Sequence, residues 1–107
     1  MNTSTIPAAL TAVAVTLATV TATAAGDPER GKKLAEPCMG CHGIPSYTNV
    51  YPSYHVPKLA GQHAEYLVSA LKAYKRGDRS HKTMRAQAAT LSDQDMVDIA
   101  AFFSTHP

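Results

Sequence analysis

Two cysteines and a histidine stand together in the pentad Cys38-Met39-Gly40-Cys41-His42. Two thiols three positions apart, followed at once by an imidazole, are the attachment sequence of a c-type haem. Each thiol can add to a haem vinyl group as a thioether, and the adjacent imidazole can coordinate the iron. One tight turn can carry all three side chains, and Gly40 leaves room for the porphyrin edge. The sequence therefore predicts one covalent haem c, with its iron, bound through Cys38, Cys41 and His42.

Two other kinds of site can contain a C-x-x-C pair, and both explain this chain less well. A disulfide or a thioredoxin-like redox pair leaves His42 without a role. The redox pair also needs a βαβ context, but no strand pattern leads into Cys38. A zinc site needs further thiols or imidazoles at ligand spacing, whereas the chain has only two cysteines. Haem attachment is the favoured interpretation.

An electron-transferring haem needs a second axial ligand, for which methionine and histidine are the candidates. The chain has four methionines: Met1, Met39, Met84 and Met96. Met1 belongs to a segment that we expect to be removed, and Met39 lies within the binding turn itself. Met96 falls on the apolar stripe of a predicted helix, where core packing explains it. Met84, in a polar stretch before that helix, is the favoured ligand, and His81 in the same stretch is the open alternative.

The amino-terminal segment has the composition of an export signal. Residues 1–25 contain no charged side chain, and small residues end the apolar run. This pattern predicts cleavage after Ala24 or Ala25, a domain spanning 26–107 and a periplasmic location. The segment lacks the usual basic residue at its start, so an uncleaved membrane anchor is the alternative. The remaining chain is short for a self-sufficient core, and a covalent haem would stabilise it.

Basic residues gather around Met84, although the whole chain carries a formal charge of only +2. They are Lys72, Lys75, Arg76, Arg79, Lys82 and Arg85, with Asp78 as the opposing charge. A solvated loop explains such a cluster, but it could also steer the haem edge to an acidic docking surface on a redox partner. The basic residues are neither dense nor interleaved with aromatic residues, so no nucleic-acid partner is expected.

The periodicity predicts an all-α domain with three main helices. The first begins at Asp27-Pro28 and runs to about Glu36, where Pro37 stops it. The second spans about 62–76 and ends at Gly77. The third follows a capping box at Ser92–Asp95 and frays after Phe103.

Two connecting segments show no clear period. Residues 43–57 contain three prolines and are predicted to form an ordered loop that wraps a cofactor. Residues 78–91 are predicted to be mostly irregular. Five apolar residues are expected to surround the haem: Leu34, Leu59, Leu67, Leu71 and Ile99.

Over residues 27–104 the chain resembles the class I cytochromes c, most closely the bacterial cytochrome c4/c553 type. The likeness rests on Gly31–Leu34 before the Cys38–His42 pentad, on Pro57–Gln62, on Tyr66–Arg79, and on Met84 followed by Leu91–Phe103. It implies a small cytochrome c fold packed around one haem. Unlike the c4 proteins, which usually have two such domains in tandem, this chain has one, and Gly43–Tyr47 replaces their glycine-rich loop.

The resemblance also implies roles for individual residues. His42 and Met84 would be the axial ligands, and the Pro57 carbonyl would accept a hydrogen bond from the second ring nitrogen of His42. Three further residues would contact the haem edge or its propionates: Gln62, Tyr66 and Arg79. Gly31 would lie where the first and last helices cross, approached by Ile99 and Phe102.

The expected function is that of an exported carrier of single electrons between redox proteins, such as a dehydrogenase and a terminal oxidase, rather than an enzyme. Contact with the membrane is expected only through such partners or through an uncleaved amino-terminal segment. Three alternatives remain open: a haem sensor with a labile sixth ligand, a peroxidase-like enzyme, and a haem subunit of a larger oxidoreductase complex.

Overall fold

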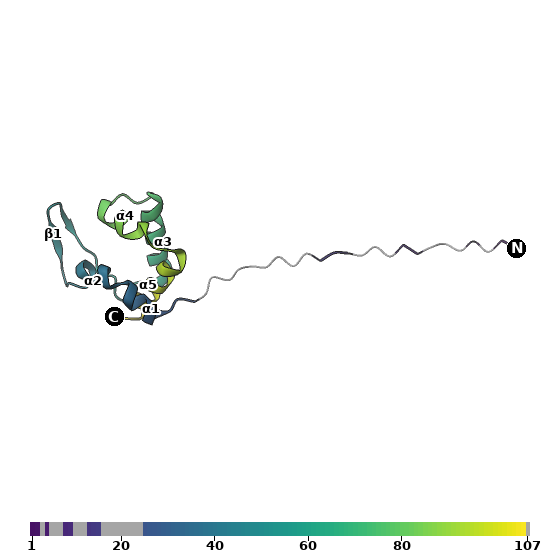
Figure 1. The fold of residues 1–107 in the computed structure, drawn as a ribbon, viewed down its shortest axis with the longest axis horizontal. Coiled ribbons are helices and arrows are strands. Elements are labelled where there is room, and N and C mark those ends of the chain that lie inside the picture. The colour runs from purple at the N-terminus through teal and green to yellow at the C-terminus, as the bar shows by residue number, and fades with distance from the viewer. Residues whose placement is uncertain (3, 5–7, 10–12, 16–24, 107) are drawn as a thin grey trace.

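The computed structural model describes residues 1–2, 4, 8–9, 13–15 and 25–106 (Figure 1). Within these residues, helices α1, α2, α3, α4 and α5 are joined by loops and one hairpin, which consists of strands β1 and β2 and lies between α2 and α3. The predicted export signal falls largely outside the described residues, as does the site after Ala24. In the described part of the chain, no helix has the length and apolarity needed to cross a membrane.

Helices α1 (Pro28–Leu34) and α5 (Asp93–Thr105) cross and begin at the predicted caps. The Asp27 carboxylate accepts hydrogen bonds from the backbone N–H groups of Glu29 and Arg30, and Pro28 occupies the first turn. The Ser92 hydroxyl and the Asp95 carboxylate exchange hydrogen bonds with each other's backbone N–H, which confirms the capping box.

The crossing is closest at Gly31, which is buried. A Cβ atom added to Gly31 would lie 1.9 Å from the carbonyl oxygen of Asp98 and 3.1 Å from the backbone nitrogen of Ile99. The expected approach of Ile99 is confirmed, and the nearest atoms belong to the α5 backbone at Asp98 and Ile99. Glycine is needed here because a side chain would collide with a carbonyl group, which cannot move away as a flexible side chain could.

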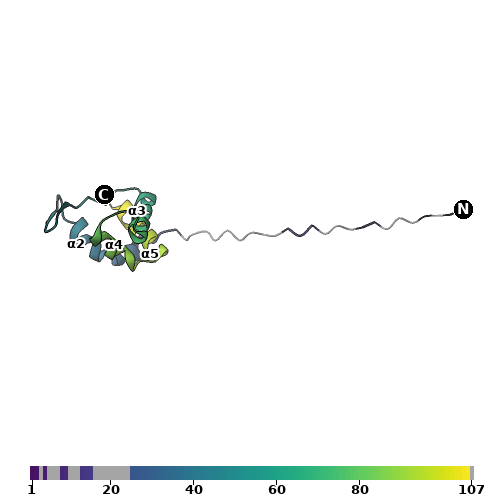
Figure 2. The same cartoon turned by 90° about the horizontal axis from the view of Figure 1, so that it is seen from above.

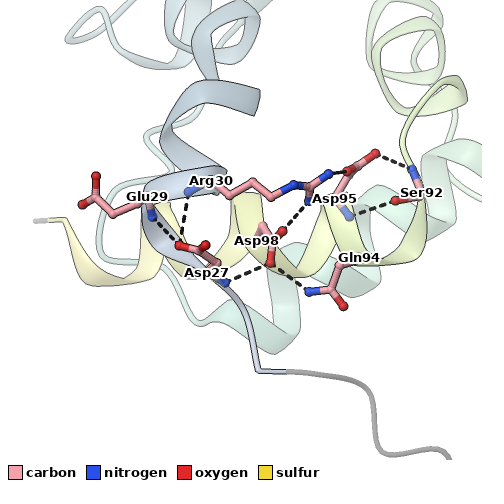
Figure 3. A network of polar contacts seen from close by, with 7 residues as sticks. All are labelled: Asp27, Glu29, Arg30, Ser92, Gln94, Asp95 and Asp98. Carbon is pink, nitrogen blue, oxygen red and sulfur yellow. Dashed lines mark hydrogen bonds and ion pairs between the residues drawn. The ribbon is translucent and has the colours of Figure 1, made fainter.

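Polar contacts also join the two helices (Figure 3). Asp98 is only 1% exposed. It accepts hydrogen bonds from the backbone N–H of Asp27 and the side-chain amide of Gln94, each at 2.9 Å, and from Arg30. Arg30 also donates to Asp95, at 2.6 Å. These hydrogen bonds hold the pKa of the Asp98 carboxyl below its usual value, the one from the Asp27 backbone most strongly.

The core lies where α3 packs on α5. Its buried members are Ala35, Leu67, Ile99, Ala100, Phe102 and Phe103. The turn before α3 is attached to the end of α5, because the backbone N–H of Gly61 donates to the carbonyl of Phe103 at 2.9 Å. This attachment holds the segment around Pro57 beside the core.

Helix α2 (Glu36–His42) corrects the predicted helix end at Pro37. The first helix ends at Leu34, and Pro37 lies in the first turn of a new helix. A proline is tolerated there because the first backbone N–H groups of a helix need no partner within it. The pentad from Cys38 to His42 is therefore the last part of a short helix rather than an isolated turn.

The loop predicted for residues 43–57 contains a small hairpin, β1 (Thr48–Val50) paired antiparallel with β2 (Ser53–His55). It projects from the helices beside α2, as both views show (Figures 1 and 2). Strands of three residues are too short to produce a recognisable alternation, which explains why the sequence pattern misses them.

Helix α3 (Ala64–Arg76) agrees with the predicted second helix and ends at Gly77, which has a φ of 88°. The prediction that residues 78–91 are mostly irregular is wrong, because α4 (Lys82–Ala89) occupies most of them. Only Ala88 of α4 is buried. A helix with so little buried surface has almost no apolar stripe, so periodicity could not reveal it.

Candidate haem-binding site

A cavity of about 390 Å³ opens between α2, the hairpin, α3, α4 and α5. Its lining includes every residue predicted to bind haem or its iron: Cys38, Cys41, His42, Pro57, Gln62, Tyr66, Arg79 and Met84. These residues are dispersed over nearly fifty positions of the sequence. The fold therefore brings the predicted site residues to one place.

Helix α2 presents both thiols to the cavity. Cys38 and Cys41 are three positions apart, which places them on the same helical face one turn apart. Both are free and half-buried. Burial raises the pKa of the Cys38 thiol above its usual value, and the nearby Cys41 adds to the shift. Two neighbouring thiols at a cavity wall suit attachment of a planar group along one edge.

His42, at the end of α2, has a defined tautomer. Its Nδ1 lies 2.7 Å from the carbonyl oxygen of Pro57. A carbonyl oxygen can only accept a hydrogen bond, so Nδ1 must carry the proton and donate. The other ring nitrogen, Nε2, then keeps its lone pair. This is the state in which an imidazole can coordinate a metal, and the hydrogen bond fixes the ring orientation.

Met84 reaches the same cavity from α4. Helices α2 and α4 both line the cavity, yet they do not pack against each other (Figure 1). The thioether is half-buried and lies in the first turn of α4. A sulfur ligand from one helix and an imidazole from another are thus available to a group that fills the space between them.

His81, the alternative axial ligand, also lines the cavity but is the N-cap of α4. Its Nδ1 lies 3.3 Å from the backbone nitrogen of Met84 and accepts that N–H. A neutral imidazole that accepts at Nδ1 carries its proton on Nε2, which cannot then bind a metal. The tautomer of His81 is the opposite of that of His42.

The rim of the cavity is polar. Arg79 Nη1 lies 3.5 Å from the hydroxyl of Tyr66, and the Arg79 guanidinium lies over the ring of Tyr74, 4.7 Å from its centroid. Gln62 lines the same cavity. A cation, a phenol and an amide around an opening can receive carboxylates, as the propionates of a haem would require.

The wall behind the rim is mostly apolar. Four of the five apolar residues predicted to surround the haem line the cavity: Leu59, Leu67, Leu71 and Ile99. Leu34 also packs against the core, but it is not among the residues that line the cavity. Phe103, a residue of the last helix, completes this wall together with Val56.

The sequence pattern does not single out three other residues of the cavity wall: Tyr54, Thr83 and Gln87. Tyr54 stands on β2, and the other two stand on α4. Both elements are too short to show a period, so no local signal points to these side chains. The His81 cap could have revealed the start of α4, but histidine is not among the preferred N-cap residues.

The residues present fit a covalently attached haem. Two free thiols lie on one helix face, an imidazole nitrogen is free to coordinate, and a thioether lies on another wall of the same cavity. Cys38, Cys41, His42 and Met84 would hold the group. The donor set of nitrogen and sulfur suits iron in a porphyrin.

Comparisons with known proteins give the same result. The Cytochrome c family model matches residues 28–107. Cytochrome c4 of Thiocapsa roseopersicina is 41% identical over 83 residues, which cover 77% of this chain and 41% of that protein. Cytochrome c-554(548) of Halomonas halodenitrificans is 40% identical over 84 residues, covering 76% of this chain and 98% of that protein.

A solved structure shows the same fold. Reduced recombinant cytochrome c4 from Pseudomonas stutzeri matches with a TM-score of 0.61 and 26% identity, over 80% of this chain and 53% of that chain. The chain spans about two fifths of the length of the cytochrome c4 relatives that it matches. The predicted all-α fold is confirmed. The chain belongs to the cytochrome c family, with cytochromes of the c4 type among its relatives, and the family implies a covalently bound haem c with its iron.

Proposed function

We propose that this protein is a periplasmic carrier of single electrons that holds one haem through Cys38 and Cys41, with His42 and Met84 as axial ligands. The observation that carries the proposal is the cavity itself. It brings the thiols and the free Nε2 of His42 together with the thioether of Met84 from a separate helix. When bound, the haem supplies a one-electron iron couple.

The protein's own residues define how that couple behaves. His42 is oriented by its hydrogen bond to Pro57, and Met84 is carried by α4, so these two side chains would hold the iron of a bound haem. Two protein ligands leave no open position for a small molecule, which suits a carrier rather than an enzyme. The apolar wall disfavours an added positive charge and so raises the reduction potential. We propose that residues 1–25 direct export, and that the redox partners are other proteins.

The test is the absorption spectrum of the holoprotein, oxidised and reduced, with and without CO. We expect the ferric parent to show the weak long-wavelength band that reports sulfur ligation, and the ferrous parent not to bind CO. Met84→Ala should lose that band and bind CO. Met96→Leu is the matched control, because Met96 is fully buried in the protein and does not line the cavity. The intact mass gives the number of haems and the amino terminus.

Other outcomes would identify the alternatives. CO binding by the parent would mean a labile sixth ligand and would favour the sensor interpretation. A Met84→Ala variant that remains low-spin and unreactive to CO would mean that His81 is the ligand. Either result would overturn the proposed His42 and Met84 pair.

A further inference from the structure

We propose that His81 is a positioning residue for Met84 and that the β1–β2 hairpin holds His81 in place through Tyr54. This inference rests on the proposed role of Met84 as an axial ligand. It assigns a function to two cavity residues that would not themselves coordinate iron, and to a hairpin whose strand residues lie outside the core cluster.

The first observation is the cap. His81 has an extended backbone, with φ −166° and ψ 111°, and its ring turns back to accept the N–H of Met84. Because α4 has eight residues and only Ala88 is buried, packing against the core contributes little to its stability. The cap acts directly on the backbone of Met84. Without it, the first turn can fray and displace the thioether.

The second observation concerns the aromatic rings that contact the His81 ring. The edge-to-face partner on one side is Tyr54 of β2, with ring centroids 4.6 Å apart and planes at 81°. Tyr74 of α3 also meets the ring edge-to-face, at a centroid distance of 6.4 Å. In addition, the hydroxyls of Tyr54 and Thr83 lie 3.5 Å apart. Two other elements, the hairpin and α3, thus contact the residue that caps α4.

Hydrogen bonds within the hairpin stabilise the strand that carries Tyr54. The Asn49 side chain donates across the turn to the carbonyl of Pro52 at 2.8 Å and accepts from the hydroxyl of Tyr47, two residues earlier, at 3.3 Å. Asn49 is also the ladder partner of Tyr54. Beyond β2, the backbone N–H of Val56 donates to the carbonyl of Tyr47 at 3.0 Å. The Tyr54 ring therefore projects from a well-connected support.

The test measures how easily an added ligand displaces Met84. Imidazole is titrated into the ferric holoprotein and followed by loss of the sulfur-to-iron band. If displacement requires the first turn of α4 to open, the apparent affinity rises with the population of the open state. We expect His81→Ala to bind imidazole about fivefold more tightly than the parent. His81→Asn, which restores a good N-cap, should return the affinity to within about twofold.

Tyr54→Leu tests the hairpin. We expect it to tighten imidazole binding about two- to fivefold in the parent and to have little further effect in the His81→Ala background, because it acts through the His81 ring. Val50→Thr is the matched control on the same hairpin, since Val50 is 67% exposed and lies outside the cavity wall, and it should match the parent. If His81→Ala does not fold, the test of the proposal rests on the imidazole affinities of Tyr54→Leu and His81→Asn.

The possible failures are distinguishable. If the parent lacks the sulfur band, or Met84→Ala and the parent bind imidazole equally, the proposed ligand is wrong. If the band is present and Met84→Ala loses it, but His81→Ala and Tyr54→Leu keep the parent affinity, then Met84 ligation stands and the positioning role is overturned. A lower thermal midpoint with unchanged imidazole affinity would likewise give His81 a purely structural role.

Discussion

The hydrogen-bond partner of each imidazole decides what that imidazole can do. His42 and His81 line the same cavity and have the same intrinsic chemistry. The Pro57 carbonyl makes Nδ1 of His42 a donor, while the Met84 N–H makes Nδ1 of His81 an acceptor. Nε2 is therefore free in His42 and protonated in neutral His81. The His42 ring is suited to coordinate iron, and the His81 ring is suited to cap the backbone of α4.

The buried carboxyl group of Asp98 leads to a prediction about the stability of the protein in acid. Its folded-state pKa lies below the ordinary value, chiefly because the Asp27 backbone N–H donates to it. A depressed carboxyl pKa stabilises the fold above the unfolded-state pKa, and that contribution is lost as the pH falls towards the folded value. We expect Asp98→Asn to lose about 2 kcal/mol of unfolding free energy near neutral pH. The deficit should be constant above about pH 5 and shrink below it.

Urea unfolding of the holoprotein between acid and neutral pH measures this difference. Asp93→Asn is the control, because the same chemical change on the same helix affects a side chain that is 75% exposed. Its pair with Lys72 at 3.6 Å should contribute less than about 1 kcal/mol. An Asp98→Asn deficit that persists unchanged in acid would mean that shape, not charge, makes Asp98 important.

At the scale of elements, the crossing of α1 and α5 is what brings the helix carrying the thiols beside the core. Ala35, between α1 and α2, is fully buried in that core, and Cys38 packs against it. The Arg30, Asp95 and Asp98 contacts fix how α1 lies on α5 (Figure 3). A substitution at the crossing should therefore lower the free energy of unfolding of the whole domain.

Gly31→Ala tests this crossing. The added Cβ would lie 1.9 Å from the Asp98 carbonyl oxygen, so the helices must separate. We expect a loss of about 3 kcal/mol in unfolding free energy, measured by denaturant titration. Lys33→Ala is the control on the same helix, because Lys33 is exposed and both residue types favour a helix, so this variant should stay within about 0.5 kcal/mol of the parent. Equal stability of the two variants would refute the close crossing.

At the scale of the whole molecule, the basic cluster is partly neutralised by its own surroundings. Arg76 pairs with Asp78 at 2.9 Å and Lys72 with Asp93 at 3.6 Å, so Asp78 is not the only opposing charge. Lys75 donates to the carbonyl of Leu91, a neutral acceptor that leaves the lysine charge in place. Within the part of the chain that the structure describes, Arg79, Lys82 and Arg85 also form no ion pair. Lys82 and Arg85 flank Met84 and are exposed, so they should contribute positive potential there.

Oxidation of the ferrous protein by ferricyanide tests this potential, because the trianion is attracted to positive charge. The rate should fall as salt is added, and Lys82→Glu or Arg85→Glu should slow it roughly three- to tenfold at low salt. Lys33→Glu makes the same charge change on α1, away from the cavity wall, and should have a much smaller effect. A rate indifferent to ionic strength would show that the cluster does not steer a negative partner.

Residue type and spacing along the chain were enough to predict the features that depend on neighbouring residues. The Cys38–His42 pentad, the caps at Asp27 and Ser92, and the stop at Gly77 each act within one helical turn, so spacing and residue type were enough to predict them. The length and apolar face of α3 were readable for the same reason.

Features that depend on partners distant in the sequence could be seen only in the folded protein. Helix α4 and the hairpin bury too little surface to leave a pattern, and Pro37 lies in the first turn of a new helix that follows the buried Ala35. The roles of His42 and His81 cannot be read from sequence, since each tautomer is set by the group that reaches its Nδ1. The type of a residue is known from the sequence, but its hydrogen-bond partner depends on which groups the fold brings next to it.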